Sequence, residues 1–283
     1  MNKAKVEILF PTIERWHCID LILKNMELAN KPKNTQILCV CAGSDKYKNY
    51  VKRNLEKIFK KVNFIENPDE GIEHDKLRSV FKGEKDWKNE INMKKIENVY
   101  KTYSLAKENI DKDVDYYWFI EDDTLFPLDI FNRYFNLLKG LKADIITGVS
   151  YYWHEFGVSP RNFWNLEVTK VFGEDDNSSE FTFNITPMNK QDEGVVKLGA
   201  SGLGNVLAKK EVILEWQPQE HTNIGSGADI SFFYNAYLKG FIAYGVWDIY
   251  LPHITKYENG DIAILGRIDK SLIPLLKNNK SYG

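Results

Sequence analysis

Three consecutive acidic residues, Glu121, Asp122 and Asp123, directly follow the apolar run from Tyr116 to Ile120. Such a run is typical of a central strand covered on both faces, and ligands of open α/β sheets bind beyond the carboxyl ends of such strands. Crowded carboxylates repel one another, and a hard cation such as Mg²⁺ or Mn²⁺ relieves the repulsion by accepting their oxygens. The run therefore predicts a metal-dependent site or, as the simpler alternative, a solvated acidic turn that closes a strand.

Two residues further along the chain have types suited to the same site. Asp229 follows the glycine-containing segment 223–228 and stands at the start of a helix predicted over 230–239, and His253 emerges from an apolar stretch. A second glycine-rich segment, 199–208, would let the backbone approach a ligand closely. Taken singly, Asp229 fits a helix N-cap and His253 a core histidine. Their order after the acids favours a site.

An alternation of strands and helices must position these residues. A first strand is predicted over Val6–Phe10, where Pro11 is expected to stop it, and a second over Ile37–Cys41, each followed by apolar residues at helical spacing. Further strands are predicted over 62–65, 115–120, 144–149 and 241–246. Such alternation implies a parallel sheet with crossover helices, as in nucleotide-binding α/β folds.

The segments between these elements differ in character. Residues 66–90 are polar and lack a clear period, which predicts a long excursion of a kind that is usually functional or mobile. Residues 151–195 carry clustered aromatic residues, glycine and short β-like pieces such as 181–185. The sequence has no internal repeat, low-complexity tract or Pro/Ser linker, so we predict one domain over 1–283.

The composition indicates an ordinary folded protein. With 283 residues, 43% of them hydrophobic, the chain can bury a sizeable core, and its net charge of -2 gives no global field for nucleic acid or an anionic membrane. The N-terminal apolar run is too short for a signal peptide, and no segment approaches the ~20 apolar residues of a spanning helix. Cys18, Cys39 and Cys41 are expected to be reduced core residues of a cytoplasmic protein.

The order of these motifs resembles that of GT-A glycosyltransferases, particularly the large family-two-like group, from Val6 to about His253. The resemblance implies an α/β fold with a Rossmann-type, mostly parallel central sheet flanked by helices and a smaller β-rich acceptor-side half. The motifs that carry it are Phe10-Pro11-Thr12-Ile13-Glu14-Arg15, Glu121-Asp122-Asp123, the segment 202–213, Ala228-Asp229-Ile230-Ser231-Phe232-Phe233, Lys239-Gly240-Phe241 and His253-Ile254.

The resemblance also implies a role for each residue of the site. Asp123 would ligate Mn²⁺ or Mg²⁺, and His253 would complete the protein's coordination. Glu121 and Asp122 would contact ribose, sugar or water at the metal. Asp229 would be the general base that removes the proton of the acceptor hydroxyl in a single, inverting displacement. Other residues implied in donor binding are Pro11, Thr12, Arg15 and Asp45.

Two positions depart from the family pattern. Ala228 stands where the family usually has Glu, although the adjacent Asp229 is retained. The second strand ends in Ala42-Gly43-Ser44-Asp45 in place of Asp-Asp-Gly-Ser, so Asp45 is the substitute candidate for the acid that reads the base. Because Asp229 precedes a helix, the helix dipole is expected to keep it ionised at neutral pH.

The resemblance assigns residues 1–125 to binding of a nucleotide-diphosphate sugar, 126–265 to the acceptor side and 266–283 to a C-terminal tail. The tail has an apolar patch over 272–276 and is expected to pack as a final helix. Candidate acceptors are a glycan, a lipid-linked sugar, a protein side chain or a hydroxylated nucleobase in DNA. Candidate stacking platforms for the acceptor are Tyr151, Tyr152, Trp153, Trp164 and Trp216.

Two other interpretations stay open. A phosphotransferase of the haloacid dehalogenase type also places acids after a buried strand, but Glu121 occupies the position of its nucleophilic Asp and would shift the attacking oxygen by about a bond length. A sugar- or nucleotide-binding protein that kept the fold and lost turnover is the non-enzyme alternative, and Ala228 is its motivation.

Overall fold

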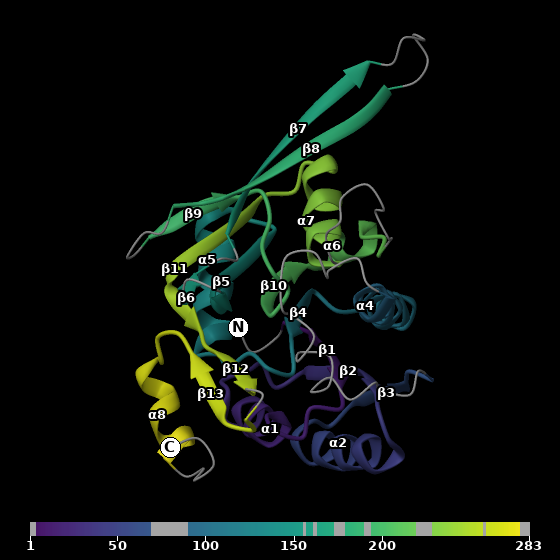
Figure 1. The fold of residues 1–283 in the computed structure, drawn as a ribbon, viewed down its shortest axis with the longest axis vertical. Coiled ribbons are helices and arrows are strands. Elements are labelled where there is room, and N and C mark those ends of the chain that lie inside the picture. Colours follow the sequence, from purple (N-terminus) through teal and green to yellow (C-terminus); the bar gives the residue numbers. More distant parts are fainter. Residues whose placement is uncertain are drawn as a thin grey trace.

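A nine-stranded sheet runs through the molecule, and helices cover both of its faces (Figure 1). This computed structural model describes residues 4–68, 90–154, 157–160, 163–172, 179–189, 194–218, 228–256 and 259–277. The strand order is β3-β2-β1-β4-β10-β5-β11-β9, and β6 pairs with β5. The strands of this sheet are β1 (Val6–Ile13), β2 (Thr35–Ala42), β3 (Val62–Glu66), β4 (Tyr116–Ile120), β5 (Ile145–His154), β6 (Gly157–Pro160), β9 (Val195–Leu198), β10 (Asn205–Lys209) and β11 (Ala243–Leu251).

Most strands of the sheet share one direction. The strands β1 to β5 and β11 run the same way, whereas β6, β9 and β10 run the opposite way. The helices are α1 (Ile19–Leu28), α2 (Asp45–Ile58), α4 (Glu90–Glu108), α5 (Ile130–Leu141), α6 (Lys210–Glu215), α7 (Ala228–Leu238) and α8 (Ile273–Lys277). The predicted α/β fold with a mostly parallel central sheet is therefore confirmed.

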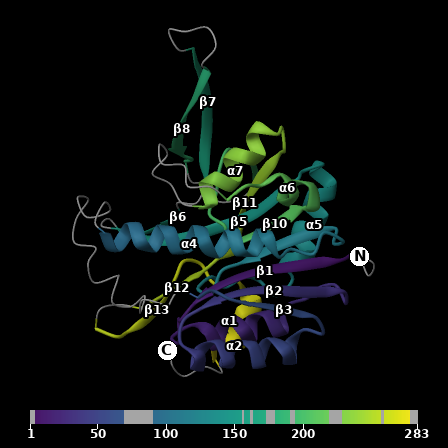
Figure 2. The same cartoon turned by 90° about the vertical axis from the view of Figure 1, so that its right-hand side faces the viewer.

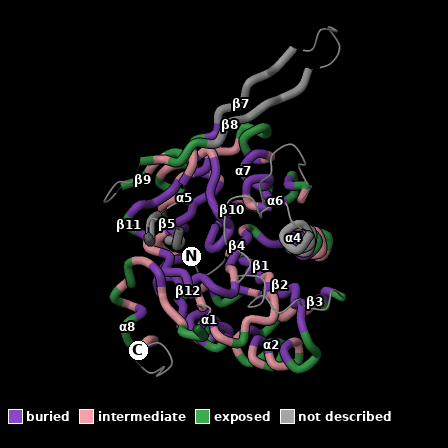
Figure 3. Tube along the Cα trace, in the orientation of Figure 1, coloured by how far each residue is buried: buried purple, intermediate pink, exposed green. Residues whose placement is uncertain are grey.

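The central strands are largely buried (Figure 3), and alternate residues divide their apolar side chains between two cores. Ile8 and Phe10 belong to the core formed with α1, α2, α5 and α8. Leu9 and Phe119 belong to the core formed with α6, α7 and the described side chains of α4. Figure 2 shows α4 on one face of the sheet and α1 and α2 on the other. Burial on both faces explains why β1 and β4 are continuous apolar runs.

The first strand does not stop at Pro11, contrary to the prediction, but continues to Ile13. Pro11 pairs with Val40 of β2, whereas pairing with β4 ends at Leu9. The amide of Ile13 points to the β4 side, where it bonds Asp122, and alternation places the nitrogen of Pro11 on that side too. Because β4 no longer pairs with β1 at this point, the N–H that proline lacks would have had no partner in the sheet. A strand tolerates proline at such a position.

The second half carries the predicted β-rich part. The ribbon of β7 (Trp164–Phe172) and β8 (Ser179–Pro187) projects from the body of the molecule (Figures 1 and 2). Its base is held by a bond of 2.9 Å from the amide of Gly199 to the carbonyl of Trp164. A Cβ at Gly199 would lie 2.0 Å from the nitrogen of Leu166, so only glycine allows this contact. In the segment 199–208, which the sequence predicts to approach a ligand, Gly199 therefore packs against β7 of the protein itself.

The described part of the predicted tail, up to Lys277, packs on the body as predicted. A short 3-10 turn (Lys270–Leu272) leads into α8, and Leu272 and Leu275 are buried in the core that includes α1. A two-stranded sheet of β12 (His253–Lys256) and β13 (Ile262–Leu265) precedes it. Most of the predicted 66–90 excursion lies outside the described residues. Within the described part of the chain, no helix combines the length and hydropathy that crossing a membrane requires.

Candidate functional site

Asp122 is held by β1 where the carboxyl ends of β1 and β4 meet. Its Oδ2 accepts hydrogen bonds from Thr12 Oγ1 at 2.9 Å and from the amide of Ile13 at 3.0 Å. Thr12 Oγ1 also lies 2.6 Å from the hydroxyl of Tyr47 on α2, which can donate to it. Asp122 is only 5% exposed, and a buried carboxylate needs such donors. These contacts fix its position without any ligand.

The guanidinium of Arg15 bridges Asp122 and Asp123. Its Nη1 lies 3.0 Å from Asp122 Oδ1 and forms a closer ion pair with Asp123 Oδ2. Burial by itself lowers the pKa of Arg15, but the charges of Asp122 and other neighbours outweigh that effect, so the pKa is raised and the guanidinium stays charged. The sequence predicted Arg15 only as a residue that binds the sugar donor. The structure shows that it also pairs with the charges of two acids.

His253 reaches the same carboxylate from the far end of the chain. Its Nε2 lies 3.3 Å from Asp123 Oδ2. Main-chain bonds hold the two segments together: the amide of Ile254 donates to the carbonyl of Asp123 at 2.7 Å, and the amide of Leu125 to that of Pro252 at 2.8 Å. The structure therefore places the two predicted metal ligands side by side.

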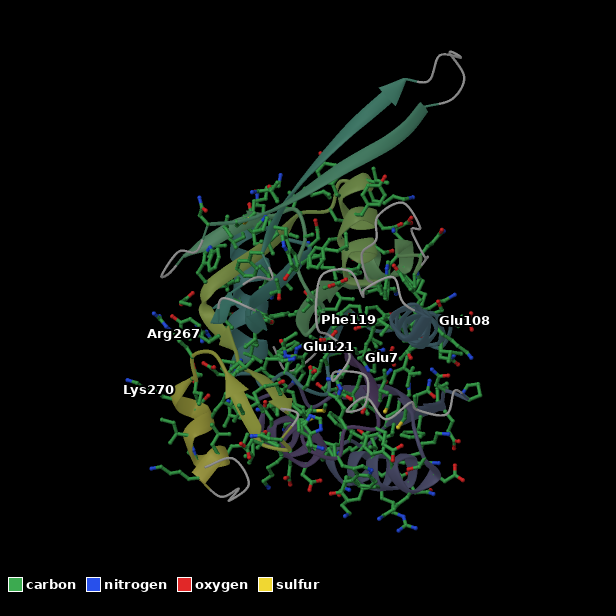
Figure 4. All side chains as sticks on the ribbon, in the orientation of Figure 1. Glu7, Glu108, Phe119, Glu121, Arg267 and Lys270 are labelled. Atoms are coloured by element: carbon green, nitrogen blue, oxygen red, sulfur yellow. The ribbon has the colours of Figure 1, made fainter. Side chains whose placement is uncertain are left out.

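Glu121 points away from this cluster, toward α4 and α7. It accepts a hydrogen bond of 3.2 Å from the hydroxyl of Tyr103 on α4. Figure 4 labels Glu121 next to Phe119, which precedes it by two residues on β4. Its amide donates to the carbonyl of Gly204 at 3.0 Å, and a Cβ at Gly204 would lie 3.3 Å from Glu121 Oε2. Burial, followed by the charge of Asp229, raises the pKa of Glu121 to about 7.

Asp229 is the second residue of α7, at the helix start that the sequence predicts. Its Oδ1 accepts a hydrogen bond of 2.9 Å from the amide of Ile230. Burial raises the pKa of Asp229, and the amides of Ile230 and of Asp229 itself oppose the rise without cancelling it. Desolvation of the carboxylate thus outweighs the amides of the helix start, and the ionised state expected of Asp229 at neutral pH stays a prediction.

Glu14, rather than Asp45, makes the observed contacts where β1 and β2 end. Asp45 is the exposed first residue of α2, and its role in reading a base stays a prediction. Glu14 accepts hydrogen bonds from the amide and the hydroxyl of Ser44, at 2.9 and 2.6 Å, and from Trp16 Nε1 at 3.1 Å. Glu14 lies inside the predicted motif from Phe10 to Arg15, of which Pro11, Thr12 and Arg15, but not Glu14, were predicted to bind the donor.

The aromatic residues predicted to stack against the acceptor differ in their burial. Trp216 is 1% exposed and packs edge-on against Tyr103 and Phe119, so it is a core residue and its prediction as a platform is wrong. Trp164 is partly buried at the base of the ribbon. The side chains of Tyr151, Tyr152 and Trp153, like the glycines of 223–227, lie outside the described residues.

Asp123 and His253 fit adjacent positions around a divalent cation. Octahedral Mg²⁺ holds its ligands at about 2.1 Å, which places neighbouring ligand atoms about 3 Å apart, close to the 3.3 Å between Asp123 Oδ2 and His253 Nε2. Among the residues that the structure describes, no group of three or more His, Cys, Asp or Glu residues is arranged to hold a metal. Among the described residues, Asp123 and His253 are therefore the two that would hold such a cation.

Comparison with known proteins places the fold. No protein-family model matches the chain, and no curated protein matches it in sequence. The crystal structure of S. aureus TarS is similar, with a TM-score of 0.53 and 11% identity over 87% of this chain and 36% of that chain. TarS 1-349 in complex with UDP (TM-score 0.52, 11% identity) and with UDP-GlcNAc (0.51, 11%) is matched over 87% of this chain.

The chain therefore spans about a third of TarS, and 60% and 58% of the two TarS 1-349 chains with UDP and UDP-GlcNAc. At these identities the likeness concerns the arrangement of strands and helices. The fold of this chain is therefore GT-A-like and similar to that of TarS.

Proposed function

We propose that the chain is a glycosyltransferase that moves a sugar from a nucleotide-diphosphate sugar to an acceptor hydroxyl with inversion. One observation carries the proposal: Arg15, Asp122, Asp123 and His253, from three separate parts of the chain, form one cluster where β1 and β4 end. That edge of an α/β sheet is where nucleotides bind. The TarS complexes with UDP and UDP-GlcNAc support a uridine nucleotide as the first donor to test.

In this proposal the cluster handles the diphosphate. Asp122, fixed by Thr12 and the amide of Ile13, holds the guanidinium of Arg15 at the sheet edge. Arg15 offers planar, charged donors that suit phosphate oxygens. Asp123 and His253 would hold Mn²⁺ or Mg²⁺, which supplies compensation for the charge that develops on the departing diphosphate.

Asp229 is the proposed general base. Its raised pKa suits the task, because a carboxylate with a higher pKa accepts a proton more readily. Glu121, whose pKa of about 7 reflects burial and the neighbouring Asp229, contacts the ribose or the sugar in this proposal. Because the base acts on the acceptor directly, no covalent intermediate is needed and the anomeric centre inverts.

The first test is a panel of nucleotide diphosphates and nucleotide sugars with Mn²⁺ or Mg²⁺, scored by thermal stabilisation and by slow donor hydrolysis. We expect stabilisation by one nucleotide class, lost in Asp123→Ala and kept in Asp129→Ala, a matched change at an exposed residue whose side chain makes no cap bond in α5. The absence of any response in the unchanged protein would overturn the proposal. A product that keeps the donor's anomeric configuration, measured by NMR, would overturn inversion.

A further inference from the structure

The oxygen of Asp123 that a cation needs is already in contact with a positive charge. Asp123 Oδ2 lies 3.3 Å from His253 Nε2 and also forms the ion pair with Arg15 Nη1. The same guanidinium nitrogen lies 3.0 Å from Asp122 Oδ1. A divalent cation bound between Asp123 and His253 would therefore meet Arg15 at that oxygen, and two positive charges repel at such a distance.

Asp122 cannot relieve this competition by offering a spare oxygen. Its Oδ2 accepts two hydrogen bonds, from Thr12 and from the amide of Ile13, and its Oδ1 accepts from Arg15. Both atoms face donors of the protein. Arg15 must consequently give way at Asp123 when a cation binds, while its bond to Asp122 can persist.

The loop that carries Arg15 allows the guanidinium to move by itself. The carbonyl of Arg15 accepts hydrogen bonds from the amides of Cys18 and Ile19, at 3.2 and 3.1 Å, so the first turn of α1 fixes the backbone. The side chain keeps 16% of its surface exposed. Rotation about its own side-chain bonds is therefore sufficient, and a phosphate offers the fork of an arginine two oxygens at once.

We propose that Arg15 is a resident counter-cation, which neutralises Asp122 and Asp123 before substrate binds and moves from Asp123 to the diphosphate when the donor and a divalent cation bind. The inference rests on the proposed function and adds to it an order of events. Without nucleotide, Arg15 holds the affinity for metal low. With nucleotide, the same residue strengthens binding, so metal and donor bind together more favourably than either does alone.

The test measures Mn²⁺ affinity directly, by electron paramagnetic resonance of the free ion, with and without UDP. In Arg15→Gln we expect Mn²⁺ without UDP to bind about tenfold more tightly, and UDP with Mn²⁺ to bind about tenfold more weakly. Arg15→Lys keeps the charge but loses the fork, so Mn²⁺ affinity stays near that of the unchanged protein while UDP affinity falls. Arg133→Gln is the matched control, because it removes the same charge from pairs with Asp248 and Asp269.

The outcomes separate this inference from the proposed function. If the unchanged protein binds UDP with Mn²⁺ but Arg15→Gln shows equal or weaker Mn²⁺ affinity without UDP, the counter-cation role is overturned and the proposed function stands. If the unchanged protein binds no nucleotide in any combination, the proposed function fails first. Circular dichroism of each variant identifies a loss of fold, and Arg15→Lys then decides the inference: it is overturned if UDP affinity does not fall.

Discussion

Glu121 and Asp122 are neighbours in the sequence but meet opposite electrostatic environments. Asp122 turns toward β1 and α2, where Thr12, the amide of Ile13 and the guanidinium of Arg15 satisfy its oxygens. Glu121 turns toward α4, where it bonds Tyr103, and burial and the charge of Asp229 on α7 raise its pKa more than the charge of Arg15 lowers it. The acidic run is therefore two regions: one in which a cation of the protein balances the charge, and one in which burial and repulsion raise the pKa.

The difference shows how a fold assigns separate tasks to adjacent acids. In the balanced region the two carboxylates face the guanidinium of Arg15. In the unbalanced region a carboxyl group with a raised pKa can take up a proton near neutral pH. We divide the predicted tasks accordingly, with diphosphate binding on the Arg15 side and proton transfer on the Asp229 side.

The largest expected effect is on the unbalanced side, at Asp229. Asp229→Asn keeps the shape of the side chain but removes its ability to accept a proton, so we expect the turnover number for sugar transfer to fall about 10³-fold. Stabilisation by UDP with Mn²⁺ should remain within error of the unchanged protein. A variant that transfers sugar at the normal rate would show that another residue is the base. Asp248→Asn, an exposed change on β11, is the control.

On the Arg15 side, we expect a substitution to lower the stability of the fold. Asp122→Ala removes the acceptor of Thr12 and of the Ile13 amide and leaves Arg15 with one acid fewer, so we expect a loss of about 3 kcal/mol in the free energy of unfolding. Urea denaturation at pH 7 measures it, with Asp129→Ala as the control. A loss below about 1 kcal/mol would mean that the contacts around Asp122 do not hold the ends of β1 and β4 together.

The smallest effect tests the raised pKa of Glu121. Because the folded protein binds this proton up to about pH 7 and the unfolded chain only up to about 4.5, wild-type stability should decrease as pH rises between these values. Glu121→Gln lacks the titration. Relative to wild type, we expect it to gain roughly 2 kcal/mol between pH 4.5 and 8, allowing for partial exposure of Glu121. Urea denaturation across this range measures the difference. A constant difference between the two proteins would exclude the shift.

The fold was predictable where the pattern is local. Apolar runs and helical spacing identify β1, β2, β4 and the helices that follow them. The helix α7 ends at Leu238, and Gly240, with its φ of 78°, lies just past it where the sequence places the glycine that ends the helix. The continuation of β1 past Pro11 was not predictable from a local pattern. Whether a missing N–H costs a hydrogen bond depends on where the neighbouring strand ends, which no local pattern contains.

The candidate site was predictable in its membership more than in its contacts. The motif order brought Arg15, Asp123 and His253 into one prediction, but the ion pair of Arg15 with both acids depends on how β1 and β4 align. Tyr103 gave no signal, because an aromatic residue in an amphipathic helix is ordinarily a core residue. Its bond to Glu121 arises from the packing of α4 across the sheet. Such contacts are set by tertiary structure.

The main-chain bonds between Asp123 and Ile254 and between Leu125 and Pro252 have a consequence for how the protein matures. They join the middle of the chain to a segment close to its end, so the closing of a very long loop precedes completion of the cluster. During synthesis, β1 and β4 can pair before β12 has left the ribosome, but Asp123 and His253 cannot meet until it has. The cluster of the proposed site is therefore completed only after β12 has been made, when most of the sheet is already available to fold.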